Sequence, residues 1–139
     1  MKIEMVVDAN GIPLGIATDA ASVPETILGP AALADIPPET EVPPATPVIA
    51  DRAYDSDPLR ERLQEEGYTL IAPHRSNRTK KSTNDGRRLR RYKRRWIVER
   101  TFAWLHSYRR VVTRYERHVT LWDGFVHLAA AFIALNKLL

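Results

Sequence analysis

The chain has no cysteine. Without a thiol it cannot form a disulfide framework, bind zinc through thiolates or use a cysteine nucleophile, and we expect it in the reducing cytoplasm. Histidine is also scarce, and three of the four residues (74, 118 and 127) show no spacing typical of metal ligands. A Gly-rich phosphate loop and an HExxH motif are absent. The 139 residues suffice for one domain with a single core, which we predict to span 1–139.

Long apolar segments are rare too. Met1 leads directly into a strand-like segment, with no basic leader and apolar run of a signal peptide. The C-terminal segment 125–139 is apolar but contains His127, Asn136 and Lys137, and it is shorter than the roughly 20 residues that cross a bilayer. We therefore expect no membrane partner, and a helix that is buried by the domain or by a partner.

The net charge of +4 hides a strong asymmetry along the chain. Residues 1–72 carry 4 Lys and Arg against 13 Asp and Glu, whereas residues 73–118 carry 16 against 3. A basic half of this kind indicates a polyanionic partner, and nucleic acid is the first candidate. One hypothesis is therefore a DNA-binding module without catalysis. RNA binding through the basic loop is a further alternative, although the stacking platforms of single-strand binders are not evident.

The order of the predicted elements is that of an α/β fold. A hairpin of two strands around Asn10-Gly11 and a short helix occupy 1–36, and five prolines make 37–47 an extended connection. Residues 48–72 read as a βαβ unit with parallel strands. A polar, basic and mobile loop follows over 73–86. The helical part 87–139 consists of one long basic helix to about residue 110 and an apolar helix from about 121 to 138.

Asp51 is the first candidate for chemistry, because it stands at the carboxyl end of a short apolar strand. Ligand-binding and catalytic groups gather at that edge of open α/β sheets, and a carboxylate there can bind Mg²⁺. The alternative is that Asp51 caps the turn that follows the strand.

Glu99 is the second candidate, in the middle of the basic helix. At 100° per residue, Tyr92, Arg95, Glu99 and His106 fall within a sector of about 60°, opposite an apolar stripe. The helix can therefore pack on a core while it presents these four side chains to a shared site. The alternative is a solvated Arg95–Glu99 ion pair worth a few tenths of a kcal/mol. Trp96, beside this sector, could stack on a base or pack in the core.

Three ordered blocks of the sequence resemble DDE-type bacterial insertion-sequence transposases. Tyr92-x2-Arg95-x3-Glu99 is similar to their signature, Tyr-x2-Arg-x3-Glu-x6-Lys. The other matching text is ADRAYDSDPLRERL at 50–63, IAPHRSNR at 71–78 and RRWIVERTFAWLHSYRRVVTRYER at 94–117. At the position of the signature Lys this chain has His106, whose shorter and mostly neutral imidazole puts the corresponding phosphate contact in doubt.

The resemblance implies a ribonuclease H-like mixed sheet with flanking helices, and a triad of two aspartates and one glutamate. Such enzymes are Mg²⁺-dependent (or Mn²⁺-dependent) endonucleases and strand transferases with two metal ions. Carried over by position, Asp51 and Glu99 are catalytic and metal-binding, and Tyr92 and Arg95 contact DNA phosphate near the cleaved end. The implied partners are the double-stranded DNA of the transposon ends and a second copy of the chain on that DNA.

The sequence departs from the family at its start. The strand that bears the first aspartate lies upstream of the segment that resembles Met1–Leu14, so it is absent here. Asp8 is more typical of a hairpin turn, and Asp55 and Asp57 of helix caps, than of metal ligands. We therefore expect the C-terminal part of a transposase core that is inactive alone, either a remnant or the second reading frame of an element whose upstream frame encodes its partner.

Overall fold

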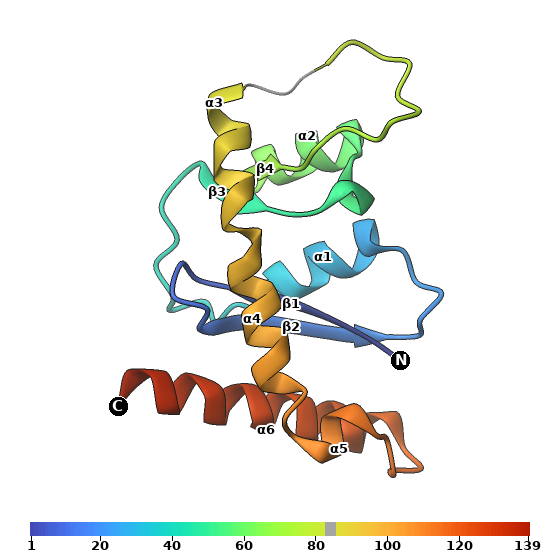
Figure 1. Ribbon diagram of the computed structural model, residues 1–139, viewed down its shortest axis with the longest axis vertical. Helices are drawn as coiled ribbons and strands as arrows, with labels where there is room; N and C mark the ends of the chain where they lie inside the picture. The colour runs from blue at the N-terminus through green and yellow to red at the C-terminus, as the bar shows by residue number, and fades with distance from the viewer. Residues whose placement is uncertain (83–85) are drawn as a thin grey trace.

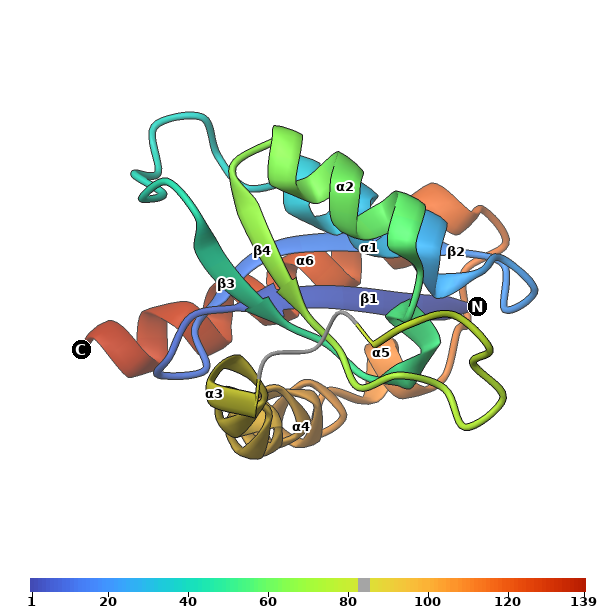
Figure 2. The same ribbon diagram turned by 90° about the horizontal axis from the view of Figure 1, so that it is seen from above.

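The computed structural model describes residues 1–82 and 86–139. It is a mixed α/β structure with two small sheets and several helices (Figure 1). Seen from above, the strands lie between α1 and α2 on one side and α3 and α4 on the other (Figure 2). Residues 83–85, near the end of the expected loop 73–86, lie outside the described residues.

The chain opens with the expected antiparallel hairpin of β1 (Lys2–Val7) and β2 (Pro13–Asp19). The turn is built by Asp8, whose Oδ1 accepts hydrogen bonds from the backbone N–H groups of Asn10 (2.8 Å) and Ile12 (2.9 Å). Gly11 takes a positive φ of 82°, which is unfavourable for residues with a side chain. The interpretation of Asp8 as a hairpin residue is therefore confirmed.

Helix α1 (Glu25–Ala34) packs against this hairpin, as expected for the short helix within 1–36. The approach is close at Gly15, where a Cβ atom would lie 2.2 Å from the carbonyl oxygen of Ala32. Any larger residue at this position would push helix and strand apart. The proline-rich connection that follows contains no helix, and its last two residues begin the next strand.

The expected βαβ unit is present. Strand β3 (Thr46–Ile49) pairs in parallel with β4 (Tyr68–Ile71), and the 3₁₀ turn η1 (Arg52–Tyr54) and helix α2 (Asp57–Glu65) lie between them. Ser56 caps α2 by accepting a hydrogen bond from the N–H of Leu59, and Pro58 occupies its first turn. Gly67, with φ of 90°, follows the end of the helix.

The prediction of one continuous helix from 87 to about 110 is wrong. This segment consists of α3 (Gly86–Leu89), the 3₁₀ segment η2 (Arg90–Arg95) and α4 (Trp96–Leu105), and a separate α5 (Arg109–Val112) follows. At the break, the Ser107 hydroxyl donates to the carbonyl of Trp104 (2.7 Å). A side chain that takes up a terminal carbonyl in this way competes with continuation of the helix.

The last helix, α6 (Val119–Leu138), confirms the expected apolar helix and lies along the bottom of the molecule in Figure 1. Its buried face forms one core with Met5 of β1, Ile16 of β2 and Leu105 of α4. A second core lies between α1, η1, α2 and β4, and Val6 packs against it. Alternate residues of β1 therefore serve opposite cores. With 20 residues and a mean hydropathy of 1.4, α6 is long and apolar enough to cross a membrane by length and composition alone.

The two sheets are not joined. Among the described strands, β1 pairs only with β2 and β3 only with β4, so each sheet has two strands. In Figure 1 the parallel pair lies above the antiparallel pair. The described residues therefore contain both pairings of the expected mixed sheet, but no continuous ladder of hydrogen bonds connects them.

Candidate functional site

Three residues of the predicted sector converge on one stripe that runs from η2 into α4. Arg95 donates from Nη1 to the hydroxyl of Tyr92 (2.7 Å) and from Nη2 and Nε to Glu99 Oε1 (2.7 and 3.1 Å). The hydrogen bond with Tyr92, and beyond it the carboxylate of Glu99, raise the pKa of Arg95. A permanently charged guanidinium is therefore held between a phenol and a carboxylate.

This stripe is open to solvent. The side chains of Arg95 and Glu99 are 36% and 58% exposed, so their ion pair has the high-dielectric environment in which such pairs contribute little to folding. Trp96, the next residue, is 54% exposed, and the hypothesis that it packs in the core is wrong. Its ring is covered on one side by the Arg100 guanidinium at 5.0 Å from the ring centroid.

The hairpin turn fixes the position of α4. The Thr101 hydroxyl, which is fully buried, donates to the carbonyl of Gly11 (2.7 Å), and Arg100 donates to the carbonyl of Asn10 (2.9 Å). A Cβ atom at Gly11 would lie 2.7 Å from Thr101 Oγ1, so the contact requires glycine there. Gly11, Arg100 and Thr101 belong to no recognised motif. The one sign of this contact in the sequence is Thr101, a polar residue on the apolar stripe of the helix.

His106 is separated from the other three residues. It caps the C-terminal end of α4, seven residues and about two turns beyond Glu99. Its ring lies 6.1 Å from that of Phe102, and it borders an apolar groove of about 700 Å³ between β1, α5 and α6. No contact joins His106 to Tyr92, Arg95 or Glu99 within 1–82 and 86–139, so the structure brings together three of the four residues of the sector.

Asp51 caps η1, the 3₁₀ turn that follows strand β3, and this capping role is the alternative to metal binding that the sequence left open. Its Oδ1 accepts a hydrogen bond from the N–H of Ala53 (2.8 Å). The described contacts include no hydrogen bond to the other oxygen, so the cap leaves part of the carboxylate available.

A second carboxylate that the sequence analysis missed, Glu4, lies near Asp51. Burial raises the pKa of Glu4, and the negative charge of Asp51 raises it further, although Tyr54 acts in the opposite direction. Tyr54 is buried in the same region, and burial followed by the charge of Glu4 raises the pKa of its phenol. The sequence does carry one sign of this buried carboxylate, because Glu4 is the single charged residue within the apolar strand 3–7.

Two divalent ions require more ligands than this part of the molecule offers. Within 1–82 and 86–139, no three His, Asp or Glu side chains come together in a group that could hold a metal ion. One oxygen of Glu99 is bound to Arg95 and one oxygen of Asp51 to the backbone. The described residues therefore do not fit a two-metal site by themselves.

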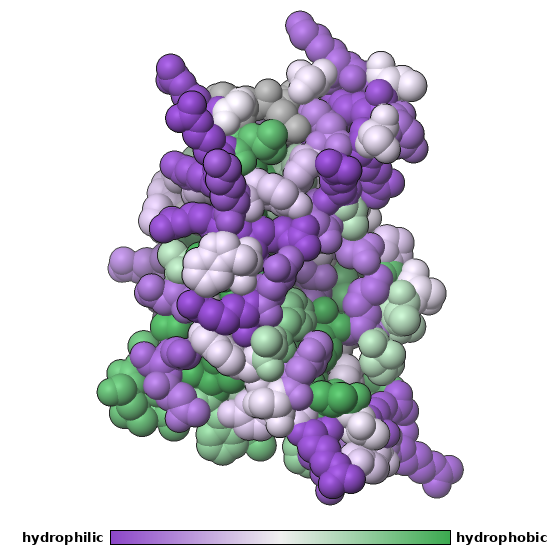
Figure 3. Space-filling model, in the orientation of Figure 1, coloured by the Kyte–Doolittle hydropathy of each residue, from purple (hydrophilic) through white to green (hydrophobic). Residues whose placement is uncertain are grey.

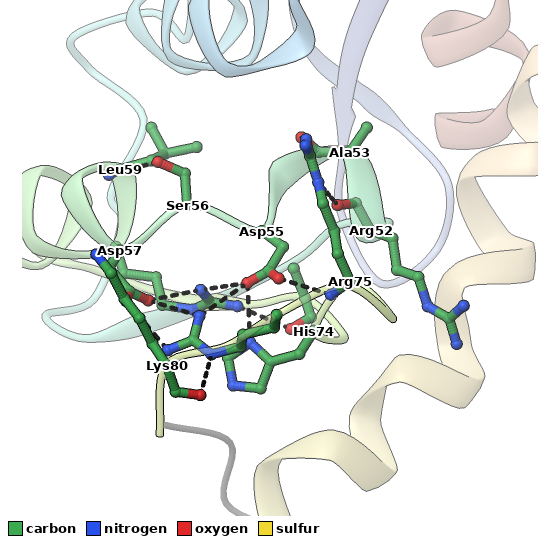
Figure 4. Close-up of polar contacts among 12 residues, drawn as sticks. Arg52, Ala53, Asp55, Ser56, Asp57, Leu59, His74, Arg75 and Lys80 are labelled. Carbon is green, nitrogen blue, oxygen red and sulfur yellow. Dashed lines mark hydrogen bonds and ion pairs between the residues drawn. The ribbon is translucent and has the colours of Figure 1, made fainter. Parts of the chain in front are cut away.

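Asp55 and Asp57 follow Asp51 closely but have a structural role. Asp55, whose side chain is 4% exposed, accepts from Arg60 (2.7 Å), from the N–H of Arg75 (2.6 Å) and contacts His74 Nδ1 at 2.9 Å (Figure 4). Burial alone would raise the pKa of Asp55, but these hydrogen bonds outweigh it and hold the pKa well below its usual range. Asp57 pairs with Arg78 at 3.0 Å. The start of the expected mobile loop is therefore tied to α2.

Basic side chains surround a shallow groove at the edge of the parallel sheet. The groove has a volume of about 240 Å³, and its lining includes Arg87, Arg88 and Arg91 together with Pro47 and Thr69. Figure 3 shows hydrophilic side chains over the upper part of the molecule, above α4. The basic segment thus extends from this groove to Arg95 on a single helical path, and it can follow a phosphate backbone.

Comparison with known proteins agrees with this arrangement. Residues 1–136 match the family model described as Transposase DDE domain. The chain is 35% identical to a transposase for insertion sequence element IS402 of Burkholderia cepacia, over 99% of this chain and 64% of that protein. It is 36% identical to a transposase for insertion sequence element IS6501 of Brucella ovis, over 97% of this chain and 98% of that protein. No solved structure matches.

The chain thus spans less than two thirds of the Burkholderia relative and nearly all of the Brucella relative. Enzymes of the matched family use divalent metal ions. The blocks that suggested the resemblance lie within the matched residues, and the signature residues Tyr92, Arg95 and Glu99 share one surface. This chain belongs to the DDE transposase domain family of bacterial insertion sequences.

Proposed function

We propose that this chain takes part in DNA transposition as the C-terminal part of a DDE transposase catalytic core, and that it binds the double-stranded DNA of transposon ends. The observation that carries the proposal is the exposed stripe in which Arg95 joins Tyr92 to Glu99. A guanidinium with a defined orientation suits a phosphate in the same way that it suits a carboxylate. When the chain binds DNA, a phosphate oxygen replaces Glu99 Oε1 as the acceptor of one of the two Arg95 hydrogen bonds.

In the complete enzyme, Asp51 and Glu99 supply two of the carboxylates that hold Mg²⁺ or Mn²⁺ for DNA strand cleavage and transfer. The third aspartate comes from a strand outside this chain, encoded upstream or in a neighbouring reading frame. The unpaired outer edges of β1 and β3 support this hypothesis, because a strand between them would join both pairs into one ribonuclease H-like sheet. Val6 of β1 and Val48 of β3 pack against the same core, so these two strands lie in the same region.

Fluorescence anisotropy of the full chain with a labelled duplex, taken from the ends of the element that carries the gene, tests the DNA-binding part. We expect affinity that falls steeply with salt, and a loss of roughly 10- to 100-fold in Arg95→Ala, since one hydrogen-bonded charge contact contributes about 1.5–3 kcal/mol. Arg62→Ala is the matched control, because Arg62 is an exposed arginine that pairs with another surface side chain, Glu66. Equal affinity of Arg95→Ala and Arg62→Ala would contradict the proposal.

Nicking of supercoiled plasmid in Mg²⁺ or Mn²⁺ tests the catalytic part. We expect weak nicking or none from this chain alone, because two carboxylates do not make the site. Any residual activity should disappear in Asp51→Asn and in Glu99→Gln. Robust nicking that survives both substitutions would refute the assigned carboxylates.

The alternative function is a basic DNA-binding module without catalysis, which the 16 basic residues of 73–118 favour. Under this alternative, duplex binding is indifferent to divalent ions and to Glu99→Gln. Under the proposal, Mg²⁺ strengthens binding to the duplex end in the natural protein and does so less in Glu99→Gln. The same anisotropy titration, repeated with chelator, separates the two.

A further inference from the structure

The side chain of Arg75 lies against η1, the short 3₁₀ turn that begins directly after Asp51. Figure 4 shows this side chain extending from beside Asp55 towards Arg52 and Ala53. Its Nε donates to the carbonyl oxygen of Arg52 (3.2 Å) and its Nη2 to that of Ala53 (3.0 Å). The last carbonyls of a helical turn have few donors within the turn, and a basic side chain commonly supplies them. Arg75 therefore closes the end of η1.

Asp51 closes the other end of the same turn. Its Oδ1 accepts a hydrogen bond from the N–H of Ala53 (2.8 Å), and its carbonyl oxygen accepts one from the N–H of Tyr54 (3.1 Å). Ala53 is thus bound twice, by Asp51 at its N–H and by Arg75 at its carbonyl. Only two backbone dihedral angles separate these two groups, so a movement at the carbonyl is passed to the N–H and to the Asp51 carboxylate that it binds.

The backbone of Arg75 is fixed as well. Its N–H donates to Asp55 Oδ2 (2.6 Å), and the Asp55 side chain is 4% exposed and is also bound by Arg60 (2.7 Å). A buried carboxylate cannot give up such donors without leaving unpaired charge in the interior. Arg75 therefore reaches η1 from a fixed point of the fold, although it belongs to the basic segment that follows β4.

These contacts distinguish Arg75 from an arginine that is available to DNA. Two of the three nitrogen atoms of its guanidinium donate to backbone carbonyls. Arg95, by contrast, donates to the side chains of Tyr92 and Glu99. Exchange of the backbone acceptors of Arg75 for a phosphate would release the end of η1. The geometry therefore favours support of the turn over direct contact with phosphate.

We infer that Arg75 is a positioning residue for the metal site, because it fixes η1 and, through Ala53, the carboxylate of Asp51. This role rests on the proposed function, in which Asp51 holds a divalent ion. It adds to the signature residues Tyr92, Arg95 and Glu99 a residue from a different segment of the chain. Residues that orient a metal ligand without touching the metal contribute strongly to metal affinity.

Fluorescence anisotropy of the full chain with the labelled duplex, titrated with Mg²⁺, tests this role. The natural chain should gain affinity as Mg²⁺ is added, and Asp51→Asn should abolish the gain. In Arg75→Ala the Mg²⁺ concentration at half of the gain should rise by roughly 10- to 100-fold, the range for residues that orient a metal ligand. Arg75→Lys should keep the affinity measured in chelator but share the shifted Mg²⁺ dependence, because one ammonium group does not reproduce the planar fork of a guanidinium.

Lys81→Ala is the matched control, since it removes one positive charge from the same basic segment and retains the backbone carbonyl that accepts from Arg78. It should keep the Mg²⁺ dependence of the natural chain. If Arg75→Ala also keeps it while Asp51→Asn abolishes the gain, the positioning role is wrong and the proposed function stands. If the natural chain gains nothing from Mg²⁺, both are wrong. A much larger loss of affinity in chelator for Arg75→Ala than for Lys81→Ala would make Arg75 a phosphate contact instead.

Hydrogen exchange measured by NMR tests the support of η1 without metal or DNA. The Ala53 amide, which binds Asp51 Oδ1, should exchange about tenfold faster in Arg75→Ala, the factor that corresponds to the loss of one hydrogen bond from a charged donor. The amide of Leu63, in α2, should exchange as in the natural chain, because the change is confined to the turn. Unchanged exchange at Ala53, or equal acceleration at Ala53 and Leu63, would overturn the positioning role.

Discussion

Two arginine–carboxylate clusters of this molecule use the same chemistry in opposite settings. Around Asp55, the carboxylate is 4% exposed and is bound by Arg60, His74 and the backbone of Arg75. Around Glu99, the carboxylate is 58% exposed and is bound by Arg95 alone among the described residues. The Asp55 cluster joins two elements, whereas the Glu99 pair lies within a single helical path.

The difference separates charge that supports the fold from charge that is available to a ligand. A buried carboxylate with several donors cannot release them without leaving unpaired charge in the interior. An exposed pair exchanges its partner for phosphate, metal or water at little cost. Both clusters lie in blocks that resemble the family, so sequence likeness alone does not distinguish them.

The largest expected effect is on stability. Asp55→Asn should lower the free energy of unfolding by about 3 kcal/mol, because it leaves Arg60 and its neighbours facing an uncharged amide in a buried site. Glu99→Gln should change it by less than about 0.5 kcal/mol. Urea denaturation followed by circular dichroism measures both, with the exposed Glu61→Gln as control. Equal destabilisation by Asp55→Asn and Glu99→Gln would remove the contrast.

Acid should weaken the Asp55 cluster. Because the folded-state pKa of Asp55 lies below the value in the unfolded chain, about 3.9, its stabilisation is present above that pH and is lost as the pH falls through the folded-state pKa. We expect the melting temperature of the natural chain to drop steeply below about pH 4 and that of Asp55→Asn to drop less. If the melting temperatures of the two proteins fall equally with pH, groups other than Asp55 determine the sensitivity to acid.

Glu4 should have the opposite pH dependence. Its folded-state pKa is raised, so its contribution to stability is complete below the unfolded value, about 4.3, and is lost as the pH rises through the folded-state pKa. Glu4→Gln should therefore stabilise the protein relative to the natural chain more at pH 7 than at pH 4. Thermal melts at the two pH values test this. If Glu4→Gln changes the melting temperature equally at pH 4 and pH 7, the pKa of Glu4 is not raised by its burial and by Asp51.

DNA binding should respond to Glu99 in the opposite direction from Arg95. In the absence of divalent ions, Glu99→Gln should bind duplex DNA a few-fold more tightly, since it removes a negative charge beside the phosphate and frees Arg95. Asp55→Asn, at a temperature where it is folded, should leave affinity unchanged. Weaker binding by Glu99→Gln without metal would mean that the carboxylate positions Arg95 instead of competing for it.

The smallest effect concerns Trp96. Because Trp96 is 54% exposed and follows Arg95, we expect its fluorescence to change on addition of a duplex with an unpaired end. Trp96→Phe should lose this signal while affinity falls only a few-fold. An unchanged signal in Trp96→Phe would assign the response to Trp104 or Trp122.

Local patterns gave most of the elements. The Asn10-Gly11 turn, the βαβ unit over 48–72 and the apolar helix near the C-terminus each have their signal within a short segment, and the structure confirms all three. The basic helix was less predictable. Its 3₁₀ segment and its end at Leu105 depend on tertiary contacts and on Ser107, and the lack of Gly and Pro suggested a longer helix.

The site shows the same division. The stripe of Tyr92, Arg95 and Glu99 follows from helical periodicity, and the structure brings these residues together. His106 fell in the same sector by angle but lies two turns away, because periodicity gives direction and not distance. Glu4 was missed, since Tyr54 and Asp51, which affect its pKa, are far along the chain and only the folding of β1 against the core that contains Tyr54 brings them near.

The contact between the hairpin turn and α4 has a consequence for how the molecule tolerates change. Thr101 and Arg100 hold the carbonyls of Gly11 and Asn10 across 90 residues of sequence, and Glu99 is the next residue along the helix. The turn thus fixes the position of α4, the helix that carries Glu99. A one-residue insertion between Asp8 and Ile12, on a loop that touches no signature residue, would displace α4 and with it Glu99, while the Tyr92, Arg95 and Glu99 motif stays unchanged in the sequence.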